Sequence, residues 1–132
     1  MTAYEICRTP PFDADVAQLK KKFPRLEKDI EDFFSGDLSH RPRDVGDPIA
    51  RVPHWWKARV GLPSHRISKR DGLRLIYRVV DDPKVVFALK LYHKAEMSTV
   101  TEAQVKRASQ QIRPILEQKL IERGVDPKML KL

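Results

Sequence analysis

Cysteine is nearly absent from this 132-residue chain, and long apolar runs are absent altogether. Cys7 is the one cysteine, which excludes an internal disulfide and any zinc site built from several cysteines. No apolar run approaches the ~20 residues that a membrane span needs, and the first residues do not form a basic segment followed by an apolar one. We therefore expect a reducing, cytoplasmic setting and no membrane partner.

Motifs that hold phosphates or metals are missing as well. The five glycines form neither a P-loop nor a GxGxxG pattern. The four histidines show neither HxH nor HExxH spacing, so we expect no metal and no cofactor. What remains for chemistry is a large set of lysines and arginines.

These cations are concentrated in the middle of the chain, whose net charge is +8 overall. Residues 51–94 hold 11 Lys/Arg against 3 Asp/Glu, whereas residues 1–50 hold 8 against 10. A regional excess of this kind favours a surface that faces a polyanion. The exposed side of a half-buried sheet would produce the same composition.

Hydrophobic periodicity predicts an α+β fold. We expect an edge strand at residues 4–7, a helix over residues 13–23 with Asp13 as its N-cap, and a second helix over residues 24–34. Residues 35–53 show no convincing period and are expected to form one long loop.

Three strands follow, at residues 54–60, 72–80 and 84–94, and the last two are joined by a turn. They predict a small twisted antiparallel sheet with the two N-terminal helices packed on one face. An additional C-terminal helical segment begins at a capping box of Thr101 and Gln104. This segment could pack on the body or dock against a partner chain.

Strand alternation puts a set of cations on the face opposite the two helices. Its members are Lys57, Arg59, Arg74, Arg78, Lys90 and Lys94. Such side chains bind a phosphodiester and stabilise the charge that builds up when it is cleaved. Metal-free cleavage uses the ribose 2′-OH as nucleophile, which DNA lacks, so RNA is the favoured substrate.

Along the chain, "LKKKFPRLEKDIEDF" is followed by "WKARV", "GLRLIYRV" and "LYHKAEMSTVTEAQV". The order and spacing of these segments resemble the RelE/ParE toxin superfamily, and the RelE and HigB branch of mRNA interferases most of all. The resemblance covers about residues 12–107 of an expected single RelE-like domain at residues 1–132. Residues 108–132 would be a helical C-terminal extension.

The resemblance implies the toxin of a type II toxin–antitoxin pair. Such toxins enter the ribosomal A site and act as metal-independent endoribonucleases. They cut messenger RNA by 2′-OH attack and leave a 2′,3′-cyclic phosphate. The implied partners are messenger RNA in the ribosome and a cognate DNA-binding antitoxin.

Carried over by position, the resemblance implies catalytic roles for five residues. Arg74 would contact the scissile phosphate, while Lys57 and Arg59 on the preceding strand would bind RNA and assist proton transfer. Lys94 matches the basic position after the last strand, and His93 could transfer protons near neutral pH. The tyrosine that RelE-type enzymes carry shortly afterwards is missing, because the matching residues are "MSTV".

A second group is expected to bind the RNA backbone without reading its sequence. It consists of Arg66, Lys69, Arg70, Arg78 and Lys90. The first three lie in the loop "SHRISKR", which an ordinary exposed turn would explain equally well.

Two other functions remain open at this stage. A ParE-like toxin on the same fold inhibits DNA gyrase without cutting nucleic acid, and it needs no cations gathered on one sheet face. An inactive, phage-encoded relative would account for the missing tyrosine.

Overall fold

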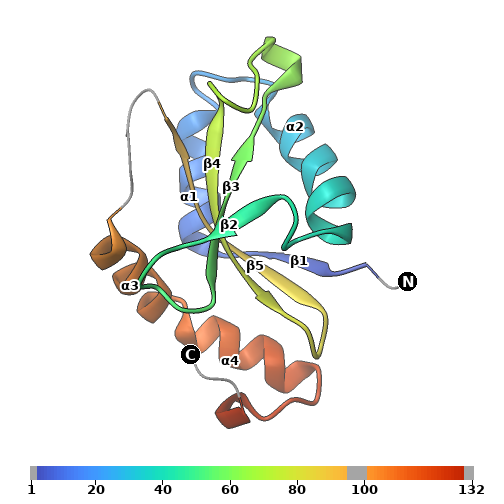
Figure 1. Ribbon diagram of the computed structural model, residues 1–132, viewed down its shortest axis with the longest axis vertical. Coiled ribbons are helices and arrows are strands. Elements are labelled where there is room, and N and C mark those ends of the chain that lie inside the picture. The colour runs from blue at the N-terminus through green and yellow to red at the C-terminus, as the bar shows by residue number, and fades with distance from the viewer. Residues whose placement is uncertain (1–2, 95–100, 130–132) are drawn as a thin grey trace.

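The computed structural model describes residues 3–94 and 101–129 (Figure 1). Within them the chain forms a five-stranded sheet in the order β1–β5–β4–β3–β2. The strands are β1 (Glu5–Arg8), β2 (Gly46–Pro48), β3 (Trp55–Val60), β4 (Leu73–Val80) and β5 (Val85–His93). Neighbouring strands are antiparallel except for β1, which runs parallel to β5. The α+β class is confirmed, and the parallel edge strand is the one departure from the antiparallel pattern that we expected.

Two N-terminal helices, α1 (Pro10–Leu19) and α2 (Leu26–Phe33), pack on one face of the sheet. Their buried stripe meets the strand residues of one parity, with Phe12, Val16, Leu26 and Ile30 against Leu73, Leu75 and Tyr77. Burying a side chain of this size contributes ~1.5–3 kcal/mol relative to leaving it exposed. This burial decides which side of β3 and β4 points away from α1 and α2.

The C-terminal segment packs on the opposite face of the sheet as α3 (Glu102–Gln111) and α4 (Arg113–Glu122). Thr101 and Gln104 form the expected capping box at the start of α3. The residues that α3 and α4 bury against β4 and β5 are Val105, Ile112, Leu116 and Leu120. Both helices lie toward the lower end of the sheet in Figure 1, and the middle of β3 remains exposed at Lys57 and Arg59.

Helix α1 begins earlier than the sequence predicted. Thr9, rather than Asp13, is its N-cap, and Pro10 and Pro11 occupy the first turn. Proline is tolerated there because the first N–H groups of a helix have no helical acceptor. The Thr9 hydroxyl makes no capping bond and instead donates to the carbonyl oxygen of Ala88 at 2.8 Å. A tertiary contact with β5 therefore replaces the local capping signal.

The predicted long loop contains more regular structure than expected. Helix α2 continues into a π-helical turn over Phe34–Leu38, and Gly46–Pro48 adds β2 to the edge of the sheet. Gly46 is needed because a Cβ at that position would clash with the Tyr77 hydroxyl. Tyr77 in turn donates a hydrogen bond to the carbonyl oxygen of Pro42 at 2.5 Å. A three-residue strand of Gly, Asp and Pro has no alternation of apolar and polar residues that would predict it.

A short 3₁₀ turn, Pro63–His65, begins the basic loop between β3 and β4. The carboxylate of Asp29 in α2 accepts hydrogen bonds from the Ser64 hydroxyl at 2.8 Å and from the Ser64 N–H at 3.3 Å. Asp29 is only 4% exposed, so these bonds replace the water that the carboxylate gives up on burial. The loop is thereby tied to the helix layer.

We expect Asp29→Ala to lower the free energy of unfolding by about 2–3 kcal/mol, because it leaves the Ser64 donors without their charged acceptor. Urea unfolding followed by circular dichroism measures the loss. Asp32→Ala, an exposed position on the same helix, serves as the matched control and should change stability by less than about 0.5 kcal/mol. Equal losses in the two variants would contradict the anchoring role of Asp29.

Arg8 links the end of β1 to both N-terminal helices. Its Nη1 and Nη2 donate to the two carboxylate oxygens of Glu27 at 2.9 and 3.0 Å, and its Nε donates to Asp13 at 2.7 Å. Hydrogen bonds from Arg8 lower the pKa of Glu27. The charged form of Glu27 is therefore favoured in the folded state.

A folded-state pKa below the unfolded value stabilises the fold above the unfolded pKa, and this stabilisation is lost as pH falls through the folded pKa. We expect the melting temperature of the wild type to exceed that of Glu27→Gln at pH 6, and the difference to shrink below about pH 4. Thermal melts from pH 7 to pH 3 measure it, with Arg8→Gln as a second variant that should behave like Glu27→Gln. A difference that stays constant over this range would contradict the pairing.

Candidate nucleic-acid interface

Two arginines face each other across the β3–β4 ladder on the side of the sheet away from α1 and α2. Arg59 and Arg74 are register partners, so their Cα atoms lie about 4.5–5.5 Å apart. Like charges at directly opposed positions destabilise a sheet. Two cations held together against their repulsion form a site that an anion would stabilise.

The basic loop between β3 and β4 holds the guanidinium of Arg74. Its Nη1 donates to the carbonyl oxygens of Lys69 at 3.0 Å and Leu73 at 3.1 Å, and its Nη2 donates to Arg70 at 2.9 Å. Burial, followed by repulsion from Arg59, lowers the pKa of Arg74. Arg74 is only 7% exposed and positions the loop, whereas Arg59 is the exposed member of the pair.

Tyr92 completes a three-strand row on this face, because it is the β5 register partner of Arg74. It is 6% exposed, and it lies with the second-face core rather than with the residues that meet α1 and α2. Tyr92 was not among the predicted site residues, although it shares its strand parity with Lys90 and Lys94. Tyr92 lies in a largely apolar strand, and apart from this parity nothing in the sequence indicates that it pairs with Arg74.

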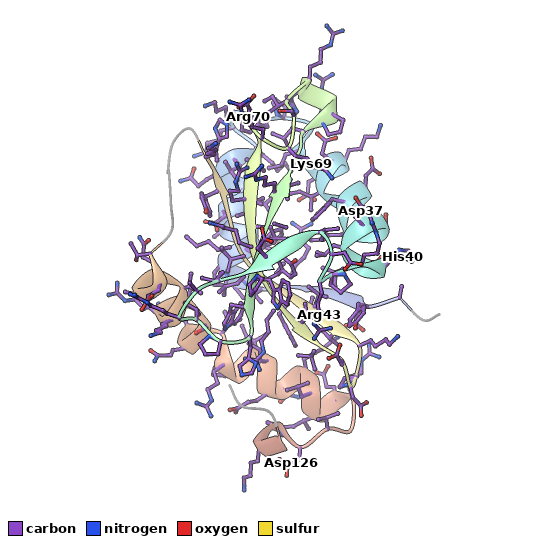
Figure 2. The ribbon with its side chains drawn as sticks, viewed as in Figure 1. Asp37, His40, Arg43, Lys69, Arg70 and Asp126 are labelled. Carbon is purple, nitrogen blue, oxygen red and sulfur yellow. The ribbon has the colours of Figure 1, made fainter. Side chains whose placement is uncertain are left out.

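The basic loop presents its cations at one end of the sheet. Lys69 and Arg70 are exposed near that end (Figure 2), and Arg66 is exposed in the left-handed backbone conformation with φ 56°. Lys69 Nζ lies 3.9 Å from a carboxylate oxygen of Asp37. An exposed pair at this distance contributes little to stability, so it leaves Lys69 able to exchange partners.

Lys57 and Lys94 lie beside this group. Lys57 is exposed on β3, two residues from Arg59 and therefore on the same face. Lys94 is exposed directly after β5, and its N–H lies 3.4 Å from the carbonyl oxygen of Gly72. We call the set that faces away from α1 and α2 the basic face, and it consists of Lys57, Arg59, Arg70, Arg74 and Lys94.

His93 lies on the other side of the sheet. Its register partner is Leu73 of the helix-covered core, and its ring packs edge-on against Phe23 with centroids 5.2 Å apart. Its Nε2 lies 3.3 Å from the carbonyl oxygen of Asp71. The sheet therefore separates His93 from Arg59, and the geometry does not bring it into the proposed catalytic group.

Two further predicted RNA-binding residues lie on the same side of the sheet as Arg74 but are engaged elsewhere. Lys90 is the β5 register partner of Ile76, and its Nζ lies 3.8 Å from a carboxylate oxygen of Asp15 in α1. Arg78 is 4% exposed and lines a cavity against α3 and α4. The predicted common face of six cations is thus reduced, because Lys90 lies beside Asp15 and the C-terminal helices pack beside Arg78.

Other expectations concern metals, membranes and the missing tyrosine. Residues 3–94 and 101–129 contain no group of three or more His, Cys, Asp or Glu side chains placed to hold a metal ion. None of the helices in these ranges is long and apolar enough to cross a membrane. The "MSTV" segment, residues 97–100, lies outside the described residues.

The chain is thus an α+β protein. It has a small mixed sheet with α1 and α2 on one face, and with α3, α4 and a cluster of cations on the other. Comparison with known proteins assigns the family within that class. Toxin RelG of Mycobacterium tuberculosis is 32% identical over 79 residues, which are 60% of this chain and 80% of RelG. The chain belongs to the RelE toxin superfamily.

One solved structure agrees with this assignment. The toxin–antitoxin complex RelBE2 of Mycobacterium tuberculosis contains a chain that is 29% identical, with a TM-score of 0.56 over 69% of this chain and 98% of that one. The toxin RelE of Escherichia coli in the free state gives a TM-score of 0.43 at 18% identity, over 83% of this chain and 98% of its own. No family model matches the chain.

The division of roles between the two arginines can be tested with a matched pair of substitutions. We expect Arg74→Lys to lower the free energy of unfolding by about 1–3 kcal/mol and to speed amide exchange at residues 69–71, because the lysine cannot reproduce the three carbonyl bonds. Arg59→Lys, at the exposed register partner, should change neither quantity measurably. Identical stability and exchange in the two variants would contradict the positioning role of Arg74.

Proposed function

We propose that this RelE-family toxin is a metal-independent, ribosome-dependent endoribonuclease. It would cleave messenger RNA by 2′-OH attack and leave a 2′,3′-cyclic phosphate. The observation that supports this proposal most directly is the opposed pair of Arg59 and Arg74 on the basic face. A gyrase inhibitor has no need for two cations held in register against their own repulsion.

The basic face fits the needs of this reaction. Exposed Arg59 can neutralise the charge that develops on the phosphate oxygens as the 2′-oxygen forms its bond to phosphorus and the bond to the 5′-oxygen breaks. The 2′-OH must lose a proton and the leaving 5′-oxygen must gain one. Lys57 and Lys94 are the exposed groups of this face that can exchange protons, and Tyr92 lies beside Arg74.

The basic loop fits contacts that do not depend on base sequence. Lys69 and Arg70 are exposed side chains whose backbone carbonyls are held by Arg74. Phosphate contacts of this kind position a nucleic acid and do not read its bases. Arg74 would therefore act through the loop, and Arg59 would touch the scissile phosphate.

The proposal includes a partner and a setting. The similar RelBE2 structure is a toxin–antitoxin complex, and we propose that this chain likewise has a cognate antitoxin that keeps it inactive. Its substrate would be messenger RNA in the ribosomal A site, in the cytoplasm. Salt-dependent affinity for RNA is expected, because the basic face would release counterions from the phosphates that it neutralises.

Arg59→Ala is the variant that tests the nuclease. Induction of the wild type in a bacterial host should arrest growth and create new messenger-RNA 5′ ends, with cyclic phosphates on the upstream fragments. Arg59→Ala should reduce cleavage on purified ribosomes by about 10²–10³-fold while the protein stays folded, because it removes charge stabilisation of the transition state. Lys28→Ala, an exposed cation on α2, should cleave as the wild type does.

A gyrase supercoiling assay run in parallel separates the ParE-like alternative. Growth arrest with inhibited supercoiling and no new RNA ends would overturn the nuclease proposal. Full cleavage by Arg59→Ala would retain the activity but reject Arg59 as the residue that contacts the phosphate.

A further inference from the structure

A cavity lies between the C-terminal helices and the sheet, away from the basic face. We call it the α3 cavity; its volume is about 410 Å³, within the range of small-molecule sites. Its wall is formed by the loop before β3, by the β3–β4 register pair Trp55 and Arg78, and by one side of α3 and α4. In Figure 1 the loop between β2 and β3 runs toward α3, and Val52, Pro53 and His54 of this loop line the cavity.

The charge of the lining is of one sign. Arg78, Lys106 and Arg113 contribute cations, and none of the residues that line the α3 cavity is acidic. Burial lowers the pKa of Arg78, which means that the charged guanidinium is disfavoured where it lies. An anion in the cavity would offset that cost directly.

The two cations on the helices are available to a ligand. Lys106 and Arg113 pair with Glu102 and Glu117 on their own helices, at 3.8 and 3.0 Å, and all four side chains are more than a third exposed. Exposed pairs one helical turn apart contribute only ~0.3–0.5 kcal/mol. A phosphate held by several donors inside the cavity would compete with such pairs easily.

The donors come from both C-terminal helices. Lys106 and Gln110 lie one turn apart on α3, beside Ser109, and Arg113 is the first residue of α4. The apolar part of the lining is Val52, Trp55 and Leu116, all buried. A ligand that suits this lining combines a negative group with a flat, apolar body.

The loop on the far wall is under backbone strain. Arg51 and His54 have φ values of 64° and 73°, although neither is glycine. Only a few per cent of residues other than glycine adopt this region, among which Asn, Asp and His are enriched, and such conformations gather at ligand sites. His54 is one of the lining residues, so the strained backbone lies at the cavity itself.

We propose that the α3 cavity binds one nucleotide, with the phosphate held by Arg78, Lys106 and Arg113. The base and sugar would lie against the apolar wall at Trp55 and Leu116. The site is built by the C-terminal helices, and this chain is longer than the toxin that it resembles: the alignment covers 98% of the RelBE2 toxin chain but 69% of this one. The C-terminal helices would thus provide a binding site as well as a cover for the sheet.

The nucleotide could come from the free pool or from an RNA chain on the basic face. The Trp55–Arg78 pair lies four residues along the same ladder from Arg59–Arg74, roughly 13 Å away, with Lys57 between them. A single strand bound at Arg59 could therefore continue past Lys57 toward the cavity. This second source rests on the proposed nuclease function, whereas the first does not.

The test measures binding to the full-length chain by calorimetry, without ribosomes. The probes are adenosine and uridine 5′-monophosphates and a 2′-O-methylated hexanucleotide, which has no free 2′-OH to react. The double variant Lys106→Gln/Arg113→Gln should weaken binding about tenfold or more, because it removes two charged phosphate donors. Ser109→Trp should block the cavity by volume without changing the charge.

Matched controls separate the cavity from general electrostatics and from the basic face. Arg107→Gln/Lys128→Gln removes two exposed cations that do not line the cavity and should bind as the wild type does. Arg59→Ala should keep its affinity for mononucleotides even where RNA cleavage is lost. The proposal therefore stands or falls independently of the nuclease activity.

Each outcome of these binding measurements either supports or overturns the proposed nucleotide site in the α3 cavity. Mononucleotide binding that both cavity variants weaken supports the site and the free pool as a source. Hexanucleotide binding alone, weakened in the same variants, supports the site with RNA as the source. Absence of binding to every probe, or binding that the cavity variants leave unchanged, overturns the proposal.

Discussion

The register between β3 and β4 is the constraint on which the rest of the structure depends. It pairs Arg59 with Arg74 and Trp55 with Arg78 on one face, and it turns Ala58 and Leu75 toward α1 and α2. A slip by one residue would move every apolar side chain to the other face. The core under the two N-terminal helices therefore fixes the positions of the cations, although it touches none of them.

Both faces of the sheet carry helices, although one of them also holds a cluster of charged residues. The C-terminal helices cover the region around Ile76, Phe87 and Leu89 and leave Lys57 and Arg59 exposed. The second face is thereby divided into a region that is core, a cavity at its margin, and a basic region. The two kinds of anion site that we propose follow from this division, because it separates Arg78 from Arg59.

Much of the fold followed from local patterns. Strict alternation over 54–60 and 72–80 predicted β3 and β4 within one residue of their ends, and the capping box at Thr101 predicted the start of α3. Patterns failed where a long-range contact decided the outcome. Thr9 became the N-cap of α1 while its hydroxyl bonded to Ala88, and Gly46–Pro48 became a strand because β3 was there to pair with it.

The candidate site was likewise predictable where local patterns placed its residues, and not where long-range contacts did. Its members on β3 and β4 share a face because side chains in a strand alternate, and the sequence by itself determined that Lys57, Arg59 and Arg74 would lie together. Only the tertiary structure decided that Tyr92 joins them, that His93 packs against Phe23, and that the Arg74 guanidinium is used to hold the basic loop. The physical reason is that the period of a strand is a local property. The pairing partner of a strand, the covering helices and the hydrogen-bond partners of a buried arginine depend on residues far away in the chain.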